Sequence, residues 1–372
     1  MLTISELYKH DIADNSIFIL EYPSSYPEHF EKSEYIVNKS KYTLDDHYRE
    51  HDYESNRIEK PHRNLAVMGN KARVYVDQKP SELLVEHWRK KLSNETLRYG
   101  QLGEKVTHVC LFPLEVLSSK LHSVNPDAHY HVHSKKFIEE IPCRQADTLS
   151  ELEFPCVLKV CRSSGGHGTW VLQDRSQFDY WNKNIQETMP NADLTVTKYV
   201  ENVVANFCCH VYLFKNGQWR WIGVTEKILN HEIWVGAFVE MDKQVAHEKL
   251  THETIKPVLK ALHEKSYFGI VGIDVLVDET AKQYVIDINP RIVGSTPLLL
   301  SAIELQKKGW SAGMFFTDVK FYNTTLIEII DNAEAVFAEN ITSCQKLKKL
   351  FMVAINGNQA LLDLLLDLKA NT

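Results

Sequence analysis

The most constraining feature of the sequence is a pair of apolar runs that share an acidic face near residue 280. The runs GIDVLVD (272–278) and QYVIDIN (283–289) are separated by a short polar segment, which is typical of a β-hairpin. If the hairpin is symmetric about residues 280 and 281, Asp274 lies opposite Asp287. Asn289 then follows two residues further along the same face, because side chains alternate along a strand.

Two carboxylates facing each other in an apolar sheet repel, and each costs several kcal/mol if it is buried without a partner. A divalent cation removes this cost, and the oxygen ligands of Asp274, Asp287 and Asn289 suit Mg²⁺ or Mn²⁺. The alternative is that both acids lie on a solvent face and pair with lysines. The hairpin alone does not decide between the two.

A glycine-rich turn about 115 residues earlier favours the metal site. The stretch KVCRSSGGHGTW places Lys159 on a strand and a run of small residues directly after it. Backbone N–H groups of such a turn can approach phosphate oxygens closely, and a nearby lysine adds a positive charge. The order of a P-loop is absent, and an ordinary hairpin turn is the alternative for this feature alone. The candidate phosphate-binding residues are Lys159, Ser163, Ser164, Gly165, Gly166 and Gly168.

Together, the lysine, the glycine turn and the acidic hairpin resemble the ATP-grasp superfamily, which includes D-alanine–D-alanine ligase and biotin carboxylase. The resemblance covers about residues 130–300. It implies that Asp274, Asp287 and Asn289 bind magnesium, with Asp287 standing where the family usually has Glu. It also implies that Arg291 and Lys159 are catalytic residues close to the transferred phosphate.

The same resemblance implies where the rest of the nucleotide binds. The segment TVTKYVE is similar to the hinge that contacts adenine, with Lys198, Tyr199 and Val200 as candidates. Asn206 or Glu201 is the candidate for the ribose. A further lysine is expected before the glycine turn, where Lys135 and Lys136 are adjacent; Lys136 is taken as the candidate and Lys135 stays open.

The activity that the resemblance implies is an ATP-dependent carboxylate–amine ligase, which works through an acyl phosphate and releases ADP and phosphate. The substrates would be small carboxylates and amines, such as amino acids or peptides, or a carrier protein. The C-terminal part is also similar to pheganomycin-type peptide ligases. Alternatives are a carboxylase-type or kinase-type ATP-grasp enzyme and a non-catalytic nucleotide-binding protein.

The expected fold is α+β, an ATP-grasp fold with an N-terminal α/β domain (1–125), the ATP-grasp domain (126–300) and a small, mainly helical C-terminal unit (301–372). In the first part, strands are expected at 16–22, 64–70 and 106–112 and a helix at 82–92. A hairpin turn is expected at Asn216-Gly217 and a helix at 248–267. The C-terminal segment NQALLDLLLDLKA is expected to form an amphipathic helix.

Composition narrows the class of protein further. The net charge is −7 over 372 residues, which argues against a nucleic-acid binder or an anionic-membrane binder. The seven cysteines include no CxxC pair, and no signal peptide or membrane span is evident, so a cytoplasmic protein is expected. A homodimer would be in keeping with similar ligases.

Three further features have two interpretations each. The stretch HYHVH is expected to place His129, His131 and His133 on one face of a strand, but zinc is not favoured because no acid or cysteine stands close by. Glu226 and Lys227 could face nucleotide or substrate, or form an exposed ion pair. Ser295 and Thr296 could bind a substrate carboxylate or cap the helix that follows.

Overall fold

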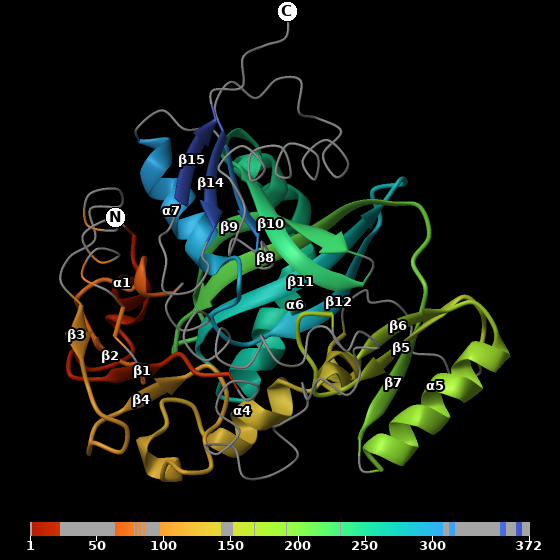
Figure 1. Cartoon of the computed structure of the whole chain (residues 1–372), viewed down its shortest axis with the longest axis horizontal. Coiled ribbons are helices and arrows are strands. Elements are labelled where there is room, and N and C mark those ends of the chain that lie inside the picture. Colours follow the sequence, from red (N-terminus) through yellow and green to blue (C-terminus); the bar gives the residue numbers. More distant parts are fainter. Residues whose placement is uncertain are drawn as a thin grey trace, which may run out of the picture.

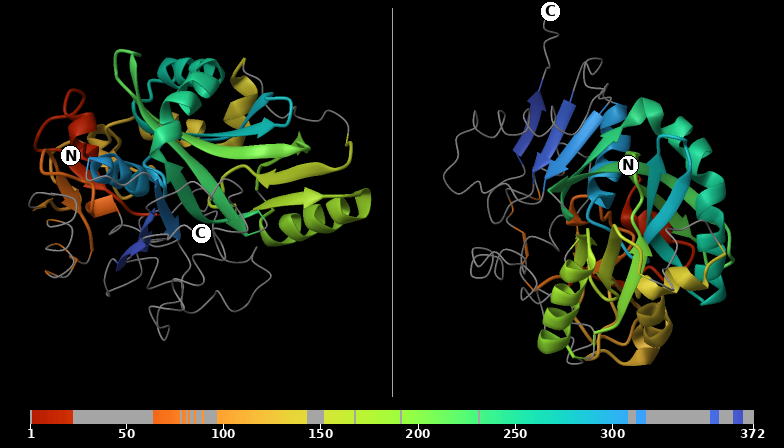
Figure 2. Two further views of the ribbon diagram at one scale, coloured as in Figure 1. Left: turned by 90° about the horizontal axis from the view of Figure 1, so that it is seen from above. Right: turned by 90° about the vertical axis from the view of Figure 1, so that its right-hand side faces the viewer.

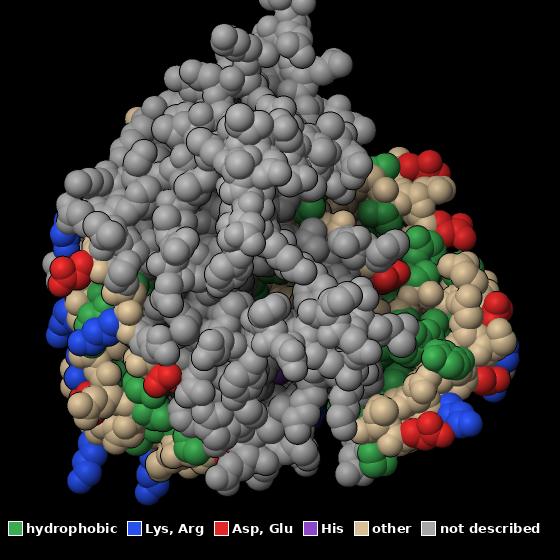
Figure 3. All heavy atoms as spheres, viewed as in Figure 1, with side chains coloured by type: hydrophobic (Ala, Val, Ile, Leu, Met, Phe, Trp, Pro, Cys, Tyr) green, Lys and Arg blue, Asp and Glu red, His purple; other side chains and the backbone are tan. Residues whose placement is uncertain are grey.

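The computed structural model contains three β-sheets, with the largest between the other two (Figures 1 and 2). It describes residues 2–22, 64–77, 97–142, 152–307, 312–316, 350–354 and 362–366, except 167, 191 and 231, together with 79, 80, 82, 85 and 89. Among these residues, no helix is long and apolar enough to cross a bilayer. Acidic and basic side chains both appear on the flanks of the face shown in Figure 3.

The N-terminal part is a small parallel sheet in the order β3-β2-β1-β4, which confirms the expected α/β layer. The strands expected at 16–22 and 106–112 are present as β1 and β4, and the described residues 82, 85 and 89 are helical. The elements are α1 (Ile4–Tyr8), β1 (Ile17–Ile19), β2 (Arg73–Tyr75), β3 (Arg98–Tyr99) and β4 (His108–Cys110).

The strand expected at 64–70 is wrong. The segment begins with two helical residues and continues as a buried turn, in which Val67 N–H donates to Asn64 and Met68 N–H donates to Leu65. The carbonyls of Val67 and Met68 accept hydrogen bonds from Ile4 and Ser5, at the start of α1. The apolar run is therefore buried because it covers a helix end, where backbone N–H groups need partners.

The segment between the first two sheets is helical, with η5 (Ser119–Leu121), α4 (Pro126–Val132) and η6 (Lys135–Glu140). The expected strand at HYHVH is wrong, because Asn125 caps α4 through the N–H groups of Asp127 and Ala128 and Pro126 occupies its first turn. On a helix, His129 and His133 share a face, and His131 instead pairs with Glu140.

The second sheet is antiparallel, in the order β6-β5-β7, and α5 packs on it (Figure 1). Asp174 caps α5 by accepting from the N–H of Gln177. The elements are β5 (Cys156–Val160), β6 (Thr169–Leu172), α5 (Arg175–Thr188) and β7 (Leu194–Lys198).

The third sheet has eight strands in the order β12-β11-β8-β9-β10-β13-β14-β15. The turn at Asn216-Gly217 joins β8 and β9 as expected, with Gly217 at positive φ, and the expected helix at 248–267 is α6. The elements are β8 (Val203–Leu213), β9 (Trp219–Asn230), β10 (Ile233–Glu240), η7 (Met241–Lys243), α6 (Gln244–Glu264), β11 (Gly269–Asp278) and β12 (Gln283–Asn289).

The C-terminal residues correct the expectation of a mainly helical unit. After α7 (Thr296–Gln306), the described residues form β13 (Ala312–Phe316), β14 (Leu350–Ala354) and β15 (Leu362–Leu366). The expected helix at NQALLDLLLDLKA therefore contains a strand, since β15 pairs with β14 and extends the large sheet through β13. The expected boundary at residue 300 falls inside α7, and the division into three domains stays a prediction.

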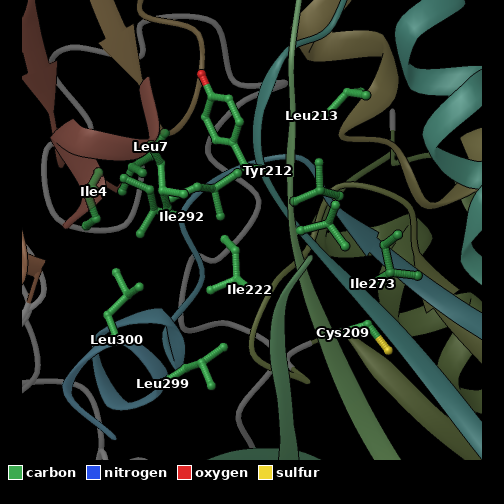
Figure 4. Close-up of a cluster of buried hydrophobic side chains, with 14 of the residues drawn as sticks. Ile4, Leu7, Cys209, Tyr212, Leu213, Ile222, Ile273, Ile292, Leu299 and Leu300 are labelled. Carbon is green, nitrogen blue, oxygen red and sulfur yellow. The ribbon is translucent and has the colours of Figure 1, made fainter. Parts of the chain in front are cut away.

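One hydrophobic core joins the first sheet to the large sheet (Figure 4). Ile4 and Leu7 of α1, Tyr212 and Leu213 of β8 and Leu300 of α7 all belong to it. The core therefore fixes the edge of the N-terminal sheet against the strands that carry the acidic hairpin.

Truncation of a core residue on β8 tests this packing. Leu213 is fully buried, whereas Val204 on the same strand is 66% exposed. We predict that Leu213→Ala lowers the free energy of unfolding by about 2–5 kcal/mol because it removes buried methyl groups and leaves a cavity. Val204→Ala should change it by less than about 0.5 kcal/mol. Urea unfolding of both variants measures the difference, and equal losses would contradict the packing described.

Candidate active site

The acidic hairpin forms with the expected register. Asp274 of β11 pairs with Asp287 of β12, and Gly272 pairs with Asn289. Nearer the turn, Val275 faces Val285, so Ile286 is an extra residue on β12. This β-bulge bends the strand beside the acid pair, and such bulges often re-aim groups at active sites.

Three lysines from three different elements surround the two carboxylates. Lys135 Nζ of η6 lies 2.9 Å from Asp287 Oδ2, and Lys227 of β9 pairs with Asp274 Oδ2. Lys159 of β5 donates to the carbonyl of the bulge residue Ile286 at 2.9 Å. The acids pair with lysines as in the alternative interpretation, but Asp274 is only 1% exposed and the side chain of Asp287 is 21% exposed, so the pair is largely withdrawn from solvent.

Burial and charge act in opposite directions on these groups. Burial raises the pKa of Asp287, but the positive charges of Lys135, Lys159 and Lys227 outweigh it, and the pKa is lowered. Burial lowers the pKa of Lys159 to about 8, assisted by repulsion from Lys135 and opposed by the attraction of Asp287. A lysine with such a pKa is an expected feature of a functional site.

Arg291 lies directly after the hairpin, with its guanidinium against the end of the N-terminal sheet. Its Nη2 donates to Asn289 Oδ1 at 3.0 Å, and its Nε is buried and has no hydrogen-bond partner in the described part of the chain. The guanidinium carbon lies 5.2 Å from the ring centroid of Phe112 and 5.9 Å from that of Tyr22. These rings follow β4 and β1, at the carboxyl edge of the parallel sheet where ligands commonly bind.

Two histidines, in α4 and at its C-terminal end, bond to backbone carbonyls close to Arg291. His129 Nε2 lies 2.9 Å from the carbonyl oxygen of Pro290, and His133 Nε2 lies 3.1 Å from that of Leu111. Burial lowers the pKa of His129 to about 4 and holds the pKa of His133 well below its usual value, so both are neutral at pH 7. The pair therefore contributes hydrogen bonds rather than charge.

The glycine turn leads directly from Lys159 to β6. Gly165, Gly166 and Gly168 all have positive φ, a conformation that favours glycine. Ser163 Oγ donates to the carbonyl of Val160 at 2.9 Å, and the carbonyl of Gly165 accepts from Trp234 N–H of β10 at 3.1 Å. The turn therefore links the second sheet to the large sheet.

The predicted hinge and ribose residues lie where the chain passes from the second sheet to the large sheet. Lys198 ends β7, Tyr199 is exposed, and Val200 leads toward β8. Asn206 lies on β8, opposite Leu276 of β11, and its buried Oδ1 has no hydrogen-bond partner within the residues that the structure describes. Asn206 is better placed inside the structure than Glu201, which is exposed; their role in binding nucleotide stays a prediction.

The structure separates the two adjacent lysines of η6. The side chain of Lys135 is 9% exposed and bonded to Asp287, whereas that of Lys136 is 45% exposed and lies 3.5 Å from Asp193. Lys135, and not the candidate Lys136, is therefore brought to the acid pair. Sequence reasoning could not separate them, because the choice depends on the direction of a short 3₁₀ helix.

Lys227 and Ser295 also differ from their expected environments. Lys227 bonds to Asp274, while Glu226 points away from it, half-buried and with its pKa raised by burial, so the two do not form an exposed ion pair. Ser295 is buried and bonds to Thr225 and His210, and Leu299 N–H donates to its carbonyl. Ser295 and Thr296 thus belong to a buried polar network at the start of α7. Their hydroxyl groups bond to Thr225, His210 and the N–H of Val293, so these contacts do not confirm side-chain capping of α7.

The donor set of the hairpin fits a hard divalent cation. Among the described residues no group of three or more His, Cys, Asp or Glu side chains is arranged to hold a metal ion, but two carboxylates and an amide meet here. Asp274 Oδ1 is buried and has no hydrogen-bond partner among the described residues, so one carboxylate oxygen of the acid pair is left for a ligand. Oxygen ligands of this kind suit Mg²⁺ or Mn²⁺.

Parts of this chain are similar to known proteins. Residues 137–289 match a family model described as L-aspartate–L-methionine ligase, ATP grasp. Among solved structures, N5-carboxyaminoimidazole synthetase from Staphylococcus aureus complexed with ADP is similar at 14% identity and TM-score 0.46, covering 76% of this chain and 72% of its own. Biotin carboxylase from Campylobacter jejuni is similar at 13% identity and TM-score 0.44, covering 80% of this chain and 71% of its own.

The chain has an α+β fold of the ATP-grasp type, and the resemblance to the ATP-grasp superfamily is confirmed. The matching family is one of amino-acid ligases, so the chain is an ATP-binding enzyme of the ATP-grasp ligase class.

The pKa of Lys159 predicts how stability depends on pH. Its folded pKa of about 8 lies below the ordinary 10.5, so between these values the unfolded chain binds more protons. This residue therefore makes the protein more stable as pH rises from 8 to 10, by up to about 3 kcal/mol. Urea unfolding of the wild type and Lys159→Met at pH 7 and pH 10 isolates the effect. A difference between the two proteins that does not change with pH would contradict it.

Proposed function

We propose that the enzyme joins a carboxylate to an amine through an acyl phosphate. The observation that carries the proposal is the buried acid pair, Asp274 and Asp287, with three lysines and Arg291 around it. Such a concentration of positive charge suits the binding and transfer of a phosphoryl group. The acid pair with Asn289 would hold Mg²⁺, which neutralises phosphate charge when bound.

The proposed reaction has two steps. The substrate carboxylate attacks the γ-phosphorus of ATP, which forms an acyl phosphate and releases ADP. The amine then attacks the acyl carbon, the C–O bond to phosphate breaks, and phosphate leaves as the amide forms. The amine loses a proton in this step. No enzyme nucleophile is needed, in keeping with Cys208 and Cys209 being buried with raised pKa values.

Each cationic side chain has a proposed role. Lys159, with the N–H groups of the glycine turn, stabilises the transferred phosphoryl group. Arg291 contacts the same group or the substrate carboxylate, because it stands between the hairpin and the rings of Phe112 and Tyr22. Lys135 contacts the nucleotide phosphates in place of Lys136.

The proposed substrates are amino acids, as in the family named L-aspartate–L-methionine ligase. They would bind at the carboxyl edge of the N-terminal sheet, where Arg291 faces the residues after β1 and β4. The cytoplasmic location, the homodimer, and peptides or a carrier protein as alternative substrates stay predictions.

Analysis of the products tests the reaction. We predict that the purified chain with Mg-ATP and pairs of amino acids, L-aspartate and L-methionine among them, releases ADP and phosphate in step with a new amide. Asp287→Ala should abolish turnover, because it removes one of the two acids of the metal site. AMP with pyrophosphate would overturn the acyl-phosphate step, and consumption of bicarbonate would indicate a carboxylase-type acceptor instead.

The neighbouring lysines provide a matched pair of variants. We predict that Lys135→Met raises the KM for ATP by about tenfold or more, since a charge-assisted contact to phosphate is worth roughly 1.5–3 kcal/mol. Lys136→Met should leave the KM nearly unchanged, because its side chain faces solvent. Steady-state kinetics at saturating amino acid measures both. The reverse order would show that the family's earlier lysine is Lys136.

A further inference from the structure

A contact between the glycine turn and β10 bridges two sheets beside the acid pair. The backbone N–H of Trp234 donates to the carbonyl of Gly165 at 3.1 Å. Gly165 belongs to the turn that follows Lys159, and Trp234 belongs to the large sheet. The chain is therefore continuous in space from the phosphate-binding turn to β10.

The indole of Trp234 lies against the segment that leaves the acidic hairpin. A Cβ atom added at Gly294 would overlap the ring, at 2.8 Å from Cζ3. Gly294 follows Arg291 by three residues, and its neighbour Val293 packs closely over Gly272, the cross-strand partner of Asn289. The ring thus rests on a backbone whose position is tied to the acid pair.

Trp234 lies on β10, which pairs with β9, the strand that carries the lysine bonded to Asp274. Trp234 faces Leu229 across the β9–β10 hairpin, two residues beyond Lys227 on β9. The hairpin register shifts between Trp234 and Gly236, a β-bulge that changes the direction of the strand at this point. Three chain segments therefore meet at one residue, Trp234: the glycine turn at its backbone N–H, β9 through the strand pairing, and the segment after Arg291 at its indole ring.

We propose that Trp234 is a positioning residue that closes this junction against water during the reaction. The inference deepens the proposed function, because an acyl phosphate that meets water returns to the carboxylate and phosphate and consumes ATP without making an amide. Trp234 holds the glycine turn through its backbone N–H, and its indole packs against the 291–294 segment, so the ring fills the space where the two meet. Exclusion of water protects such intermediates. No group on the ring takes part in bond making.

The test compares ADP formed with amide formed. Trp234→Ala keeps the backbone N–H that bonds to Gly165 and removes only the ring. We expect a several-fold rise in ADP released per amide, with a smaller change in the KM for ATP. Trp234→Phe, which retains an aromatic ring, should recover most of the coupling. Tyr180→Ala, which truncates an aromatic residue 55% exposed on α5, is the control and should leave the ratio unchanged.

A substitution at Gly294, against which the indole packs, tests the same ring in a second way. Gly294 does not have positive φ, so Gly294→Ala strains the backbone little but forces the indole to move. It should raise the ratio as Trp234→Ala does. In the double variant Trp234→Ala/Gly294→Ala the clash is gone, so the second change should add nothing to the first.

The outcomes separate this inference from the proposed function. If the wild type forms ADP and amide and both single variants keep one ADP per amide, the seal is overturned. Additive effects in the double variant would also overturn it, because the two residues would then act independently. If the wild type itself forms no amide with any substrate pair, the proposed function fails, whatever the variants do.

Discussion

The repulsion between two opposed carboxylates, and its compensation by lysines, is the interaction on which the arrangement of this enzyme depends. Asp274 and Asp287 face each other on adjacent strands, and burying them requires positive charge or a metal. The lysines come from η6, β5 and β9, elements of the connecting segment, the second sheet and the large sheet. Because the lysines that balance the two negative charges come from these elements, they bring three separate parts of the chain together.

The N-terminal sheet contributes to the same centre by another route. Its core is continuous with that of the large sheet, so the carboxyl edge of β1 and β4 is fixed against Arg291. His129 and His133 strengthen this junction with hydrogen bonds to Pro290 and Leu111, at no cost in added charge beside the arginine. A substrate at this edge would therefore bind to a surface that the core and these hydrogen bonds hold in position before it arrives.

The parts of the site that lie within one hairpin could be predicted from the sequence, since strand alternation and a short turn determine which residues oppose each other. Asp274, Asp287 and Asn289 are of this kind. The choice of Lys135 over Lys136 and the pairing of Lys227 depend on contacts between distant segments, which local periodicity does not contain. Two errors have local causes: the cap at Asn125-Pro126 makes a helix of the histidine run, and sheet pairing overrides the helical pattern around Leu364.

The bulge at Ile286 has a consequence for how such sites can be recognised. The hydrogen-bond partner of Lys159 is a main-chain carbonyl, which every amino acid supplies, and it is present because β12 has one residue more than its partner strand. The information for this contact is therefore held in the length of the segment between the turn and Asp287. Exchange of the residue at 286 can leave the contact intact, whereas an insertion or deletion there cannot. In a comparison of related chains, this contact would show as a constant number of residues between the turn and Asp287, and not as a conserved amino acid at position 286.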